Sequence, residues 1–135
     1  MKMSLFDRVQ REIPSGTFFY TPIRKNRHRI EYENDMVLFF KDDNEKPFSK
    51  TPKICWDRIP VFLKNKGWIK IGAKFDVAPR GSFQEYIDTF HSQGKTSSSE
   101  ANDIASILER LEVVEINRKL PSKIKLKTGQ SSTER

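Results

Sequence analysis

The hydrophobic pattern is clearest between residues 97 and 127, where a helix is followed directly by a hairpin. Ser97 and Glu100 have the spacing of a capping box, in which the serine accepts from the backbone three residues on and the glutamate reaches back. Apolar residues then recur at helical spacing and predict one buried face: Ala101, Ile104, Ala105, Leu108 and Leu111. The pattern predicts a helix over residues 98–111.

The opposite face of this helix is polar. Its side chains are of the types that hydrogen-bond to base edges in a major groove: Ser98, Ser99, Asn102, Asp103, Ser106 and Arg110. Any surface helix also presents a polar face, so the stripe alone leaves open whether these residues read DNA or only face solvent. Residues 100–115 hold five acidic residues and one basic residue, a balance that would repel phosphates at close range.

Strand periodicity begins directly after the helix. Val113, Val114 and Ile116 precede a turn at residues 119–122, and apolar residues then alternate with lysines. Residues 117–128 contain five basic side chains and no acidic one, as expected of a segment that lies along phosphates: Arg118, Lys119, Lys123, Lys125 and Lys127. Lysines also protect exposed sheet edges from aggregation, which is the alternative interpretation.

The middle of the chain predicts two further helices and a short strand. The first helix covers residues 54–66, although Pro60 should either kink it or mark its start. A short strand follows at residues 68–71. Ser82 and Glu85 then form a second capping box before another apolar run, so a helix begins there.

The first 50 residues predict a small β-rich lobe. A short helix at residues 5–11 stops before Pro14, and strands follow at residues 17–23, around Ile30 and at residues 36–41. The last of these is nearly all apolar and should be buried on both faces. Residues 42–52 read as a polar loop. Four basic residues precede the second strand: Arg24, Lys25, Arg27 and Arg29.

Residues 51–127 therefore have the element order helix, short strand, helix, turn, helix, strand, turn, strand. This order resembles that of winged helix-turn-helix proteins, and it is most similar to the helix-then-wing order of bacterial regulators of the multiple-antibiotic-resistance and arsenic-repressor type. The resemblance implies an α+β fold with a winged helix after a small N-terminal antiparallel sheet, a recognition helix at residues 98–111 and a wing tip at residues 118–123. Residues 128–135 are expected to form a disordered tail.

Composition narrows the class of partner. The 135 residues include 25 Lys and Arg against 18 Asp and Glu, so the net charge is +7 and the pI about 9.6, which favours anionic partners. The length fits one domain, with the strand lobe packed against the rest. No apolar run approaches the ~18 residues of a membrane span, and the first 16 residues lack the apolar core of a signal peptide. We expect a cytoplasmic protein with no membrane partner.

Residues for catalysis or metal binding are scarce. Cys55 is the only cysteine, and with His28 and His91 it cannot supply a structural zinc set. Residues 94–96 imitate the end of a P-loop, but Thr89 stands where its first glycine would be. None of the 18 acidic residues has a lysine two positions later, the spacing of a restriction-type nuclease core. We therefore expect no enzymatic activity, no cofactor and no metal.

The sequence thus predicts sequence-specific binding of double-stranded DNA, by a transcription regulator or by the recognition module of a restriction or modification system. Phosphate contacts are expected from the wing and from the basic cluster: Lys95, Arg118, Lys119, Lys123, Lys125, Arg24, Lys25, Arg27 and Arg29.

Two alternatives stay open. One is a non-catalytic adaptor in which the winged helix is a protein-interaction scaffold and the positive charge serves solubility or an acidic partner. The other is an RNA-binding module in which Phe18, Tyr20 or Tyr32 stacks on bases beside the cluster at residues 24–29. Exposed aromatic residues on the N-terminal strands favour RNA, and buried ones disfavour it. The aromatic residues of this lobe are also candidates for core packing, the more expected use, and for a homodimer seam.

Overall fold

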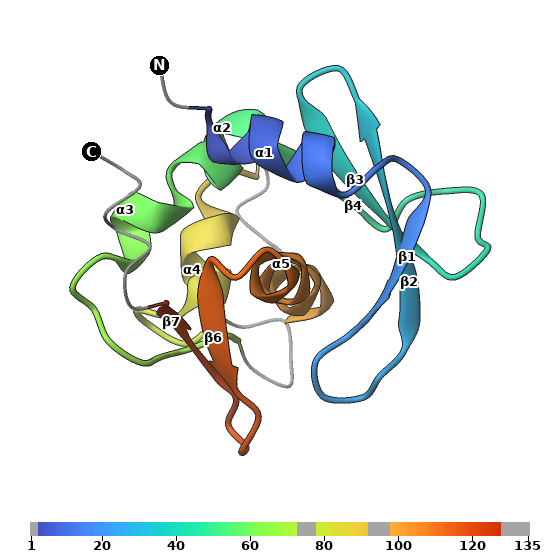
Figure 1. Cartoon of the computed structure of the whole chain (residues 1–135). Coiled ribbons are helices and arrows are strands. Elements are labelled where there is room, and N and C mark those ends of the chain that lie inside the picture. Colours follow the sequence, from blue (N-terminus) through green and yellow to red (C-terminus); the bar gives the residue numbers. More distant parts are fainter. Residues whose placement is uncertain (1–2, 73–77, 92–97, 128–135) are drawn as a thin grey trace.

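A computed structural model describes residues 3–72, 78–91 and 98–127 (Figure 1). The α+β class and the N-terminal antiparallel sheet are both confirmed. Within these ranges no helix is long and apolar enough to cross a membrane. The residues of the expected tail lie outside the described ranges.

The N-terminal part is a helix followed by a four-stranded sheet. Helix α1 (Leu5–Glu12) is capped by Ser4, whose Oγ accepts from the Asp7 N–H at 3.1 Å. The antiparallel sheet has the order β1-β2-β3-β4, with these bounds: β1 Thr17–Tyr20, β2 Arg27–Glu33, β3 Met36–Lys41 and β4 Ser49–Pro52. Strand β3 is buried on both faces as predicted, because Val37, Leu38, Phe39 and Phe40 are all buried.

Strand β4 corrects the prediction of a continuous loop over residues 42–52. It pairs antiparallel with β3, with Phe39 opposite Ser49. The inward positions of β4 are Ser49 and Thr51, which are buried although they are polar. No alternation of apolar and polar residues therefore marks this strand in the sequence.

The second half follows the predicted element order. Its elements are α2 Lys53–Asp57, α3 Ile59–Leu63, β5 Ile69–Lys70, α4 Phe83–Asp88, α5 Ser98–Arg110, β6 Val114–Asn117 and β7 Lys123–Leu126. The helix predicted over residues 54–66 is divided at Arg58, and α3 starts with Pro60 in its first turn, where proline costs no hydrogen bond. The second sheet has the order β5-β7-β6.

Helix α5 lies at the centre of the molecule. Helix α4 and strand β6 pack on one side of it, and β1 passes across another (Figure 1). One hydrophobic cluster joins both halves of the chain around it, with Phe6, Phe39, Trp56 and Ile104 among its members. Because α5 is enclosed from both sides, Ile107 is buried together with the apolar face that the sequence predicts.

Candidate nucleic-acid interface

The polar stripe of α5 is largely covered by the N-terminal sheet. Asp103 is fully buried, and its carboxylate oxygens lie 2.8 and 2.9 Å from Nδ1 of His28 on β2. Ser106 Oγ donates to the Tyr20 carbonyl on β1 at 2.7 Å. The expectation that Asp103 faces solvent is therefore wrong, because β1 and β2 occupy the space that a major groove would need.

The other residues of the stripe differ in exposure. Ser99, Asn102 and Ser106 are half-buried, whereas Arg110 at the end of α5 is exposed. The Ser98 side chain and Lys95 lie outside the part of the chain that the structure describes. Within that part, Arg110 is the one residue of the predicted stripe that keeps an exposed side chain.

The buried carboxylates of α5 sit in an internal polar cluster. Burial raises the pKa of Asp103 to about 6, and the contact with His28 opposes this rise. One turn earlier, Glu100 accepts from Thr51 Oγ1 at 2.6 Å and lies 3.0 Å from Nε2 of His91. The hydrogen bond to Glu100 raises the pKa of His91. Both carboxylates therefore serve to hold α5 against its neighbours.

Two further acidic residues near the end of α5 are also held internally. Glu109 accepts hydrogen bonds from both terminal nitrogens of Arg118, at 2.6 and 2.8 Å. Glu112 accepts one from Lys127 Nζ at 2.9 Å. Basic partners within the molecule therefore offset most of the negative charge of residues 100–115. The electrostatic objection to nucleic-acid binding near α5 is correspondingly weaker.

The outer face of the β5-β7-β6 sheet carries three lysines, and a tryptophan stands directly before β5. We call this surface, which consists of Trp68, Lys70, Lys123 and Lys125, the lysine face. Side chains alternate along a strand, and Ile124 is fully buried, so its neighbours Lys123 and Lys125 point outward. Lys70 lies directly opposite Lys123, and Lys125 Nζ is 5.4 Å from the Trp68 ring centroid. The Trp68 side chain is 42% exposed.

The lysine face is poorly compensated. Like charges placed directly opposite each other on a sheet destabilise it. Among the described residues, no carboxylate lies within 4 Å of Lys70 or Lys123. Glu115 lies opposite Lys125 on β6 and supplies one negative charge to the same face. The surface therefore carries an excess of positive charge that nothing described in the chain pairs with.

A second uncompensated group, which we call the loop pair, consists of Arg24 and Lys25 in the β1–β2 loop. Both residues are exposed, and Lys25 has a left-handed φ of 59°, which costs a non-glycine residue energy. Hydrogen bonds between Thr21 and Asn26 close the loop, at 2.9 Å backbone to backbone and 3.0 Å to the Thr21 hydroxyl. The loop pair is therefore presented on a closed, defined turn.

Arg118 connects the loop pair to the β6–β7 hairpin, for which the sequence predicts a wing. Its Nε donates to the Pro22 carbonyl at 3.1 Å while its terminal nitrogens bind Glu109. The β6–β7 hairpin and the β1–β2 loop consequently project in the same direction (Figure 1). Arg118, which the sequence predicts to contact phosphate, already has internal partners that fix the position of the β6–β7 hairpin.

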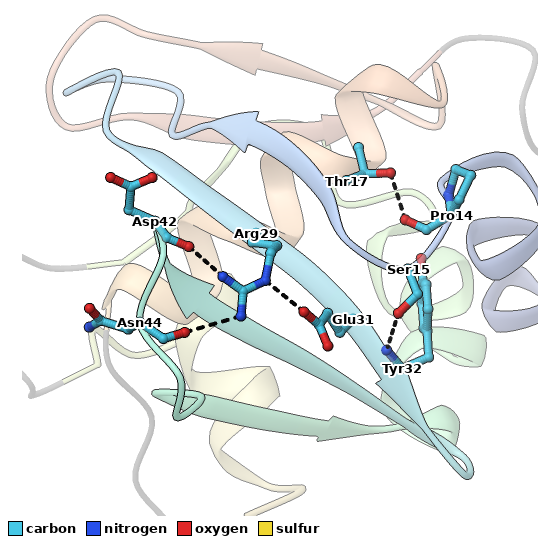
Figure 2. A network of polar contacts seen from close by, with 8 residues as sticks. All are labelled: Pro14, Ser15, Thr17, Arg29, Glu31, Tyr32, Asp42 and Asn44. Atoms are coloured by element: carbon cyan, nitrogen blue, oxygen red, sulfur yellow. Dashed lines mark hydrogen bonds and ion pairs between the residues drawn. The ribbon is translucent and has the colours of Figure 1, made fainter.

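The remaining arginines of the basic cluster also have internal partners. Arg27 Nε donates to Asp42 Oδ1 at 2.7 Å, and this hydrogen bond raises the pKa of Arg27. Figure 2 shows Arg29 donating to Glu31 and to the carbonyls of Asp42 and Asn44, at 2.6, 2.6 and 3.1 Å. Of the residues predicted to contact phosphate, the following make no ion pair within the described ranges: Arg24, Lys25, Lys119, Lys123 and Lys125.

Trp68 and Lys70 were not among the predicted site residues. A sequence signal for them exists, because residues 58–75 contain five basic residues and no acidic one. The signal can be interpreted only when β5 is known to pair with β7, because that pairing places Lys70 beside Lys123. Strand β5 is two residues long, too short for its pairing to be read from periodicity.

The chain was compared with protein-family models, with curated proteins and with solved structures, and none of them matched.

Proposed function

We propose that residues 51–127 form a winged helix and that the protein binds double-stranded DNA mainly through its phosphates. The element order and the sheet order β5-β7-β6 support the first part. The observation that carries the second part is the pair of opposed lysines, Lys70 and Lys123, on an exposed face without a carboxylate partner among the described residues. A phosphate placed between them removes the repulsion that their pairing creates.

A duplex fits the rigidity of this arrangement. The lysine face lies on a hydrogen-bonded sheet, and the loop pair lies on a closed turn that Arg118 ties to the wing. The spacing of the cations is therefore fixed, and the phosphates of a duplex are likewise regularly spaced. Trp68 and its neighbour Lys125 add an amphipathic contact at one end of the face.

In this proposal α5 contributes little to reading sequence. Its Asp103 is buried, and Ser106 is engaged with β1, so contacts to base edges are left to Arg110 and to the wing. Phosphate contacts position a protein on DNA without reading its sequence. Binding should accordingly depend strongly on salt and weakly on DNA sequence, which departs from the sequence-specific reader that the polar stripe suggests.

The test is fluorescence anisotropy of a labelled 20-base-pair duplex across a series of salt concentrations. Each phosphate contact contributes about 0.9 to the slope of log K against log salt, so Lys70→Ala with Lys123→Ala should lower that slope by about 1.8. The matched control is Lys46→Ala with Lys50→Ala, which removes the same charge from the β3–β4 side and should leave the slope unchanged.

Tryptophan fluorescence gives an independent readout. Trp56 is fully buried and Trp68 is partly exposed, so DNA on the lysine face should protect Trp68 from iodide quenching. The Trp68→Phe variant should lose this protection signal. If the wild-type protein binds no duplex at low salt, or if both lysine pairs change the slope equally, the proposed function is wrong and the adaptor hypothesis gains.

A further inference from the structure

Strand β1 exposes two aromatic side chains on the outer face of the N-terminal sheet. Phe19 points inward and is buried against His28 and Phe39, so its neighbours on β1 point outward. Phe18 is 39% exposed and Tyr20 is 58% exposed. Large aromatic residues gain stability by burial, so two of them exposed on one face of an edge strand call for a partner.

The outer face around these rings is organised by arginines. The Arg27 guanidinium lies 4.3 Å from the Phe18 ring centroid, and that of Arg29 lies 4.2 Å from the Phe40 ring centroid. Acidic side chains and loop carbonyls hold both guanidinium groups, as Figure 2 shows for Arg29. Phe18 and Phe40 therefore each lie against a guanidinium group, and Tyr20 is the most exposed ring of the described β1.

The surroundings of Tyr20 select the chemistry of the partner. The loop pair follows Tyr20 within five residues and has no carboxylate partner among the described residues. Aromatic rings beside uncompensated cations suit bases linked by phosphates, because every base has a stacking face and every link an anionic charge. A neutral apolar protein segment would use the rings and leave the cations unpaired.

The spacing along β1 also fits a strand of unpaired bases. Alternate residues of a strand lie about 6.6 Å apart on one face, roughly twice the ~3.4 Å rise of a nucleotide strand. Nucleotides of an unstacked strand lie farther apart than this rise, so Phe18 and Tyr20 can each meet one base of an extended strand. Ser106 and Arg118 fasten the end of β1 and its loop to α5 and the β6–β7 hairpin, so the loop pair is held next to the hairpin that carries Lys123 and Lys125.

We propose that the Phe18–Tyr20 face stacks unpaired bases of a DNA strand that continues from the duplex held by the lysine face. This inference rests on the proposed function and narrows its substrate to DNA with a single-stranded extension. The loop pair lies between the two surfaces and neutralises phosphates where the duplex ends.

The experiment compares three labelled ligands: a blunt duplex, the same duplex with a six-thymidine extension, and that duplex with a six-uridine RNA extension. Stacking of one base on one ring should make the DNA extension increase wild-type affinity about five-fold or more. Tyr20→Ala should abolish the increase while leaving the affinity for the blunt duplex unchanged. Tyr20→Phe keeps the ring and should retain the increase.

Tyr20 is a safe position for these variants because its packing contact with α5 uses the backbone carbonyl, which every substitution retains. Equal urea midpoints of the variants and the wild type establish that folding is intact. Lys70→Ala with Lys123→Ala should weaken the blunt and extended duplexes by the same factor, since it acts on the other surface.

The two proposals fail in different ways. If the wild-type protein binds blunt and extended duplexes equally, or if Tyr20→Ala retains the increase, the stacking inference is wrong while duplex binding stands. A stronger increase with the RNA extension than with the DNA extension overturns the assignment to DNA. Absence of binding to every duplex overturns both proposals, and a protein partner then becomes the explanation for the exposed rings.

Discussion

Asp103 offers the sharpest test of the arrangement around α5, because solvent exposure and burial predict opposite results for its replacement. The residue lies between α5 and β2, against His28, with the charges of Glu100 and Lys41 close enough to affect it. We consider Asp103→Ala, Asp103→Asn and, as a control, Asp35→Asn, which removes the same charge from an exposed position.

The loss of stability in the Asp103→Ala variant follows from the buried His28 ring that it leaves without a partner. His28 is itself buried, and removing its carboxylate partner leaves a buried polar ring without that contact. Breaking a buried ion pair on one side costs about 3–5 kcal/mol, and leaving a neutral donor unpaired costs about 1–3 kcal/mol. We therefore expect Asp103→Ala to lower the free energy of unfolding by about 3 kcal/mol.

The asparagine variant tests the electrostatics. The pKa of Asp103 is about 6 in the folded protein against an ordinary value of 3.8, so the folded state holds the proton more tightly. The stabilisation from this tighter proton binding is fully present below pH 3.8 and is lost as the pH rises through about 6. The total loss is at most about 3 kcal/mol, at about 1.36 kcal/mol per pKa unit. Asparagine does not titrate, so its stability relative to wild type should improve as the pH rises from 4 to 7.

Urea unfolding followed by far-ultraviolet circular dichroism at pH 4.5, 5.5 and 7.5 measures all three variants. With a urea m value of about 1–3 kcal/mol per molar, a loss of about 3 kcal/mol shifts the midpoint by about 1–3 M. An alanine variant as stable as the Asp35→Asn control would refute the burial of Asp103 beneath the sheet. A wild-type to asparagine difference that does not vary with pH would refute the raised pKa.

Two other titratable groups give simpler predictions. Cys55 is fully buried, and burial raises the pKa of its thiol, so Ellman's reagent at pH 8 should label it only after urea is added; immediate labelling of the folded protein would contradict this. The hydrogen bond that His91 donates to Glu100 raises the pKa of His91 above 6.5, so this contact stabilises the fold below pH 6.5 and the contribution is lost as the pH rises through the raised value. Titration of the His91 ring by NMR should show the raised pKa and its fall in Glu100→Gln; equal values in both proteins would be inconsistent with the contact.

Apart from β4, the order of the elements was predictable from the sequence because its signals are local. Capping residues and helical spacing mark α4 and α5, and the interruption at Pro60 is visible in one turn of chain. The covering of α5 was not predictable. His28 and Asp103 are 75 residues apart, and a polar stripe looks the same in sequence whether water or a polar partner covers it.

The candidate site was predictable in part for the same reason. Lys123 and Lys125 alternate with apolar residues along β7, so the sequence alone places them on one face of the strand. Lys70 joins them only through the pairing of β5 with β7, which is a tertiary contact. Conversely, Arg27, Arg29 and Arg118 look like free cations in the sequence, and only the fold supplies their acidic partners.

The enclosure of α5 also has a consequence for synthesis on the ribosome. Arg8 in α1 donates to the carbonyl of Leu111 at 2.7 Å, so α1 finds this partner only after residue 111 has been made. Until α5 emerges, the inner side of the N-terminal sheet can pack only against earlier elements, such as Trp56 of α2 beside Phe39, and part of it stays uncovered. The nascent chain should therefore bind chaperones late into translation. It should become protease-resistant in one step, when α5 packs between β1 on one side and α4 and β6 on the other.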